Sequence, residues 1–223
     1  MKPGCLPMIL LALLGVCVFG LNARAEDHAG HAAHAAPAQA AFTGDPYPLA
    51  TDPVTGEALP DKPIIDQAAT GEVRFASAES QAKFKADPKT YEAKIEKAII
   101  EQQSKDYALE ICPGSGEKLG GMGEPTQHVF GNRLIKFCCD GCPDDVKKDL
   151  KAAFDKQDAA IIAKQKPTYA LTTCPVSGEK LDDKAIDVVL GSKLIRLCCK
   201  DCVEELHKHP AKVLAKVNEA SAK

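Results

Sequence analysis

The chain has few large aromatic side chains and no long run of basic residues. It contains no tryptophan, and aromatic residues make up only 5% of its 223 residues. A single large core would normally hold more large rings, so the composition favours several small modules. The net charge is −3, and no basic run is long enough to indicate nucleic-acid binding.

Patterns typical of enzyme active sites are also missing. No Ser/His/Asp set, paired-carboxylate pattern or phosphate-binding loop rises above chance in this sequence. We therefore expect a protein that is not an enzyme.

Residues 1–25 have the features of a secretion signal. Lys2 provides the positive start, residues 5–21 the apolar centre, and Ala23–Ala25 a small-residue cleavage site. The alternative is a membrane anchor, but the apolar stretch contains Pro7 and falls short of a span. We expect a periplasmic or otherwise exported protein with no stable membrane span after cleavage.

Residues 26–44 form a leader rich in histidine and alanine, a composition that predicts disorder. If cleavage follows Ala25, the mature chain begins at Glu26 and has His28 as its third residue. The free amine, two backbone amides and the imidazole of His28 then make the square-planar nitrogen set that copper(II) and nickel(II) prefer. His28 is therefore a candidate metal ligand. The alternative is a flexible leader whose histidines have no specific role.

The rest of the chain repeats one unit three times. The copies begin at Tyr47, Tyr107 and Tyr169, and each continues with a turn, a β-rich stretch and a helical stretch. Such regular spacing is typical of repeated structural units. We expect three modules, with the boundaries 45–104, 105–166 and 167–223.

Local patterns predict the same elements in each copy. A Pro-x-x-Gly sequence favours a tight turn, and β-rich runs around Gly191 and Ser192 predict a hairpin in the third copy. A helix follows, interrupted at Pro88 in the first copy and at Pro210 in the third, but unbroken in the second. The predicted fold class is α+β: three tandem modules of turn, β-hairpin and helix.

Eight cysteines remain after removal of the signal, four in each of two copies. The second copy contains Cys112, Cys138, Cys139 and Cys142, and the third contains Cys174, Cys198, Cys199 and Cys202. The matching positions of the first copy are Asp52, Ala76, Ser77 and Ser80. All four thiols are missing there together while the turn and the apolar positions remain. This pattern indicates that the four cysteines of a copy form one site.

Three interpretations of this site are open. In the first, a cysteine in the turn and a Cys-x-x-Cys at a helix start gather around a soft metal ion, as in zinc-ribbon and treble-clef sites. In the second, the eight cysteines form four structural disulfides in an oxidising compartment. In the third, Cys139 and Cys142 exchange disulfides with other proteins, although the chain lacks a βαβ pattern.

Three short motifs resemble the YHS and TRASH-like metal-binding modules. They read DPVTG from Asp52, FKADPKTY from Phe84 and FCCDGC from Phe137. The resemblance covers about residues 45–218, in three copies. It implies small treble-clef-like α+β modules that bind heavy-metal ions through cysteines, often in metal transport, sensing or resistance.

The chain also departs from that family's pattern. The C-x-x-x-C positions are matched by Cys138 with Cys142 and by Cys198 with Cys202. The turn cysteine of the family falls instead on Thr55, Ser115 and Ser177, while Cys139 and Cys199 are additions. We expect the first module, which has no cysteine, to bind no soft metal and to serve as a packing or partner surface.

Together these features predict an exported heavy-metal-binding protein. Soft sulfur ligands suit copper(I) or zinc, and the expected role is that of a carrier, buffer or resistance factor. The expected partners are metal ions and other envelope metal-handling proteins. The alternatives are a disulfide-stapled structural or interaction protein and a thiol–disulfide exchange protein.

Overall fold

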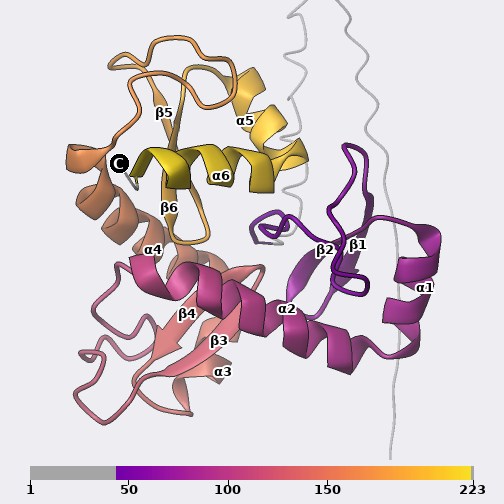
Figure 1. The fold of residues 1–223 in the computed structure, drawn as a ribbon. Coiled ribbons are helices and arrows are strands. Elements are labelled where there is room, and N and C mark those ends of the chain that lie inside the picture. The colour runs from indigo at the N-terminus through magenta and orange to yellow at the C-terminus, as the bar shows by residue number, and fades with distance from the viewer. Residues whose placement is uncertain (1–43, 222–223) are drawn as a thin grey trace, which may run out of the picture. The chain divides into compact units, whose positions relative to one another are not determined.

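The computed structural model describes residues 44–221, which form three units of a β-hairpin followed by helices (Figure 1). This confirms the predicted α+β class. The predicted signal peptide and residues 26–43 of the predicted leader lie outside the described residues, and His28 is among them. Among the described residues, no helix combines the length and the apolar character needed to cross a bilayer.

The first unit contains a hairpin and two consecutive helices. Its elements are β1 (Ile64–Ala68), β2 (Gly71–Phe75), α1 (Ala78–Ala86) and α2 (Pro88–Gln103), followed by a short 3₁₀ turn (Ser104–Asp106). The strands are antiparallel. The break before Pro88 is confirmed, and the Asp87 side chain accepts a hydrogen bond from the Thr90 N–H at the start of α2.

The second unit repeats this order but corrects one expectation. Its elements are β3 (Thr126–Phe130), β4 (Arg133–Phe137), α3 (Cys142–Lys148) and α4 (Leu150–Gln165), followed by a 3₁₀ turn (Lys166–Thr168). The predicted unbroken helix is wrong, because the chain bends at Asp149 without any proline. The Asp149 side chain accepts from the Ala152 N–H, so a capping aspartate starts a second helix there.

The third unit has the same layout. Its elements are β5 (Ile186–Leu190), β6 (Lys193–Leu197), α5 (Lys200–Lys208) and α6 (Pro210–Ser221). Gly191 and Ser192 connect the strands as predicted, and Gly191 has a φ of 61°, in the left-handed region that glycine adopts freely.

Each unit has a small core of its own. Phe75, Phe137 and Leu197 end the second strand of the three hairpins, and all three are fully buried. In the first unit the Phe75 and Phe84 rings pack edge to face, with centroids 5.2 Å apart. These small cores also join one another, because Val129 of β3 packs in the core of the first unit and Ile161 of α4 packs with Leu194 of β6.

Two glutamines connect each unit to the next. The Gln103 side chain, at the end of α2, donates to the carbonyl of Asn132 and accepts from the Leu134 N–H, at 3.0 and 2.8 Å. The Gln165 side chain, at the end of α4, makes the equivalent bonds to Ser192 and Leu194, both at 2.8 Å. Each glutamine thus satisfies backbone groups of the following hairpin.

A buried ion pair also crosses between units. The Asp45 carboxylate accepts two hydrogen bonds from the guanidinium of Arg133, at 2.8 and 2.9 Å, and one from the Gly191 N–H at 2.7 Å. Burial raises the pKa of Asp45, and the Arg133 charge opposes that effect. Segments from all three units therefore meet at this carboxylate.

Candidate metal centres

Two groups of three cysteine sulfurs lie in the described part of the chain, one group in each thiol-bearing unit. The first triad is Cys112, Cys138 and Cys142, and the second triad is Cys174, Cys198 and Cys202. Within each triad the three Sγ atoms all lie within 4.8 Å of one another. Sulfurs this close can contact a single soft ion together.

A tight bend positions the first sulfur of each triad. In the second unit the Cys112 N–H donates to the carbonyl of Glu117 at 2.7 Å, and the Gly116 N–H donates back to the carbonyl of Cys112 at 2.8 Å. Cys174 makes the same pair of bonds with Glu179 and Gly178. Gly116 and Gly178 have φ values of 80° and 79°, so the bend requires glycine at these positions.

The other two sulfurs come from the junction between hairpin and helix. Cys138 directly follows β4 and Cys142 begins α3, with 3.8 Å between their Sγ atoms. In the third unit the Sγ atoms of Cys198 and Cys202 are 3.6 Å apart. The buried phenylalanine or leucine before each pair holds the end of the hairpin against the core.

A lysine from the second helix holds each bend in place. The Lys156 ammonium, on α4, donates to the carbonyl of Pro113 at 2.9 Å, and the Lys216 ammonium, on α6, donates to the carbonyl of Pro175 at 2.7 Å. These prolines follow the turn cysteines directly. Each lysine therefore fixes the bend and adds a positive charge near the thiols.

The turn cysteines are poised to be thiolates. Burial alone raises the pKa of Cys112, but the N–H groups of Ser115, Cys138 and Gly114 outweigh burial and lower this pKa to about 6. The pKa of Cys174 is lowered to about 6 by the equivalent donors in its own unit. At neutral pH each triad therefore contains a sulfur that is already ionised.

The helix-start cysteines behave in the opposite way. Burial raises the pKa of Cys142 to about 12, with hydrogen bonds to the neighbouring cysteines adding to the effect. Burial also raises the pKa of Cys202 well above its usual range. Each of these thiols keeps its proton at neutral pH and must release it when a cation binds.

The fourth cysteine of each unit lies beside its triad. The Sγ of Cys139 is 3.4 Å from the Sγ of Cys142, and the Sγ of Cys199 is 3.4 Å from the Sγ of Cys202. Neither belongs to the group whose sulfurs all lie within 4.8 Å of one another. Cys139 is half-buried and Cys199 is exposed.

The first unit has the same bend, and there the carboxylate of Asp52 takes the place of the turn cysteine. One Asp52 oxygen accepts from the N–H groups of Val54 and Thr55 at 2.8 and 3.2 Å, and the other accepts from the Ala76 N–H at 2.7 Å. These donors occupy the same repeat positions as Gly114, Ser115 and Cys138. Sequence reasoning missed this role of Asp52, although its position in the repeat was visible.

The eight predicted cysteine ligands divide between two environments. Six form the triads, and Cys139 and Cys199 lie at their edges. All eight cysteines in the described part of the chain are free thiols, which disagrees with the disulfide alternative.

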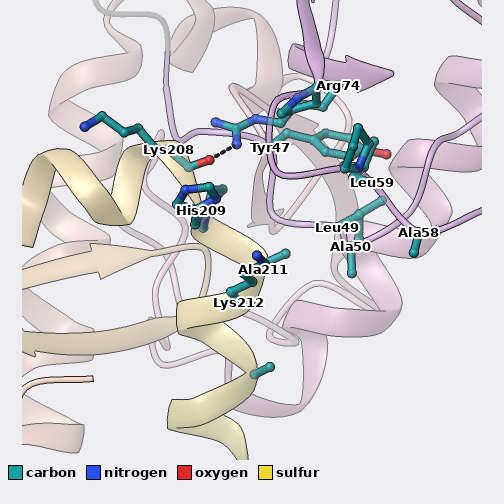
Figure 2. Close-up of a pocket in the computed structure, with 14 residues that line it drawn as sticks. Tyr47, Leu49, Ala50, Ala58, Leu59, Arg74, Lys208, His209, Ala211 and Lys212 are labelled. Carbon is teal, nitrogen blue, oxygen red and sulfur yellow. Dashed lines mark hydrogen bonds between the residues drawn. The ribbon is translucent and has the colours of Figure 1, made fainter. Parts of the chain in front are cut away.

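The described residues also include a cavity of about 280 Å³, shown in Figure 2, that is unrelated to the thiols. No cysteine is among its lining residues. Arg74, from β2, lines the cavity and donates to the carbonyls of His207 and Lys208 near the end of α5, and Figure 2 shows the bond to Lys208. The cavity therefore lies where the first and third units pack together.

No family model matches the chain, and neither the curated proteins nor the solved structures include a match to it.

Proposed function

We propose that this protein is an exported metal-binding protein that carries or buffers copper or zinc through two cysteine-thiolate sites. The observation that carries the proposal is the convergence of three sulfurs in each triad, from a bend and a helix start far apart in sequence. The motif resemblance to YHS and TRASH-like modules supports the same function. The predicted signal peptide supports a periplasmic location and, with it, a role in metal resistance or in supply to other envelope proteins.

The donor set favours copper(I) over zinc. Three thiolates satisfy copper(I), which accepts three-coordinate sulfur sites, whereas zinc in structural sites takes four ligands. Zinc would need the sulfur of Cys139 or Cys199 as its fourth ligand, and both lie outside the compact group. The predicted leader, with His28, adds nitrogen ligands for copper(II).

The test is a count of bound ions in cysteine variants. The mature protein, purified reduced and without oxygen, is loaded with copper(I) or zinc, and metal and free thiols are measured together. We expect two ions per chain in the wild type, one in Cys142→Ser or Cys202→Ser, and none held tightly by the double variant. The matched control is Ser80→Ala, at the same repeat position of the first unit, which should keep both ions.

Two results would contradict the proposal. One is a double variant that binds as many ions as the wild type. The other is purified protein whose eight cysteines are all cross-linked and that takes up no metal.

One observation favours a second candidate function, thiol–disulfide exchange. The 3.4 Å between the sulfurs of Cys139 and Cys142, in a Cys-x-x-Cys at a helix start, would need only a small movement to form a bond. A readily reversible and fairly oxidising potential in the metal-free protein would support it.

A further inference from the structure

We propose that Cys139 and Cys199 are exchange thiols, through which a soft metal ion passes between each triad and a thiol-bearing acceptor. This inference rests on the proposed function of the triads and adds the route by which their cargo leaves. The acceptor is defined by its chemistry: a protein or peptide that presents cysteine thiolates.

The geometry places each of these thiols between its triad and solvent. Cys142 and Cys202 are buried, with 7% and 5% of their surfaces exposed, while Cys139 is half-buried and Cys199 exposed. Each outer sulfur lies 3.4 Å from the buried helix-start sulfur. An ion held by the helix-start sulfur can therefore contact the outer sulfur before it leaves the triad.

A capping role does not explain cysteine at position 199, and Cys139 is not a cap at all, because Gly141 is the N-cap of α3. In the first unit Ser77 is the N-cap of α1, and its hydroxyl accepts from the Ser80 N–H at 3.2 Å. Cys199 is the N-cap of α5 in the third unit, and its side chain makes no capping hydrogen bond. Sulfur is a weak acceptor and serine a preferred cap, so serine would serve this helix better.

Transfer by this route is a ligand substitution without electron transfer. The outer cysteine gives its proton to solvent and its thiolate bonds to the ion, while a bond from the ion to a triad sulfur breaks. An acceptor thiol then loses its proton and bonds in turn, and the released cysteines take protons from solvent. The ion keeps its oxidation state throughout.

The two sites differ in access, which sets an order of release. Cys138 is buried, whereas its counterpart Cys198 is half-buried, and Cys199 is more exposed than Cys139. We therefore expect the third unit to release its ion faster than the second.

The experiment measures metal loss from the mature protein loaded with copper(I). The acceptor is a bead-bound peptide with two cysteines, and the copper left on the protein is measured over time. In the double variant Cys139→Ser and Cys199→Ser we expect two ions per chain still bound. We expect transfer to slow by at least about tenfold, a change of about 1.4 kcal/mol in the barrier. Neither cysteine makes a capping hydrogen bond, and serine occupies the matching position of the first unit, so the variant should fold; circular dichroism checks this.

The matched control replaces exposed neighbours of the two thiols, Asp140→Ser with Lys200→Ser, and should leave the rate unchanged. An equal transfer rate in the cysteine double variant would overturn the inference. So would the loss of bound copper from that variant, because Cys139 and Cys199 would then be obligatory ligands. A wild-type protein that binds no copper would instead refute the proposed function itself.

Discussion

Asp52, Cys112 and Cys174 sit in the same bend and receive hydrogen bonds from the same backbone positions. For Asp52 the donors are the N–H groups of Val54, Thr55 and Ala76. Burial by itself raises the pKa of Asp52, but these donors outweigh burial and lower it. The bend therefore stabilises a negative charge whether the atom is oxygen or sulfur.

The lowered pKa values of Cys112 and Cys174 predict how stability depends on pH. Both shift from 9.0 to about 6, so between these values the folded protein holds thiolates while the unfolded chain holds thiols. The unfolded state then binds more protons, and stability must rise with pH from about 6 to about 9. Above pH 9 the raised pKa of Cys142 acts in the opposite direction, so the rise should end there.

Urea unfolding of the reduced, metal-free protein at several pH values measures this dependence. The variant with Cys112→Ser and Cys174→Ser should show a flatter profile between pH 6 and 9. The comparison is the single variant Met122→Ala, because Met122 is exposed, carries no ionisable group and lies outside the bend. A wild-type stability that stays constant across this range would show that the turn thiols are not ionised early.

At the scale of elements, the repeat pattern predicted the hairpins but missed one helix boundary. The hairpins could be predicted because glycine and β-rich runs act locally, as at Gly191. The break at Asp149 could not, because we expected proline to be its cause. In the structure Asp87 and Asp149 both cap the second helix of their unit, and the proline beside Asp87 is not required for the break.

The contacts made by Gln103 and Gln165 were also beyond the sequence. Nothing local indicates that a side-chain amide at a helix end will face the hairpin of the next copy. The triads could be predicted only in part. The spacing predicted that the cysteines of a copy meet, but the sequence did not show that Cys139 and Cys199 lie outside the groups of three sulfurs, because this depends on side-chain directions at the helix start.

These glutamine contacts carry a prediction about stability. Gln165→Ala leaves the carbonyl of Ser192 and the N–H of Leu194 without their partners. This should lower the free energy of unfolding by about 1–3 kcal/mol. Gln103→Ala should cost a similar amount for the same reason. Chemical denaturation measures both, with Gln102→Ala as control, since Gln102 is exposed and makes only one long bond of 3.4 Å. If the two variants lose no more unfolding free energy than the control, the glutamine contacts between units do not stabilise the fold.

At the scale of the whole molecule, the same arrangement of bend, hairpin and helices occurs three times, and two of the three units contain a cysteine triad. The first unit has the same hairpin, helix start and bend as the others, with a core that contains no cysteine. The same arrangement of elements therefore occurs in a unit that has no thiol site. The Asp45 carboxylate and the two glutamines join the units through groups that do not belong to the triads.

If the shared bend, hairpin and helix start are sufficient for metal binding, cysteines placed in the first unit should create a third metal site. The substitutions are Asp52→Cys, Ala76→Cys and Ser80→Cys, at the repeat positions of Cys112, Cys138 and Cys142. The background is the variant with Cys142→Ser and Cys202→Ser, which should hold no ion tightly. We expect one copper(I) per chain to appear, because the same N–H donors surround the new turn thiol.

Elemental analysis after anaerobic loading gives the count, and circular dichroism shows whether the fold is kept. A chain with only Asp52→Cys and Ser80→Cys in that background supplies two sulfurs and should bind more weakly. The outcome that contradicts the prediction is a folded triple variant without bound copper. Metal binding would then require features of the second and third units that lie outside the shared bend and helix start, and the repeat would specify the fold without specifying the site.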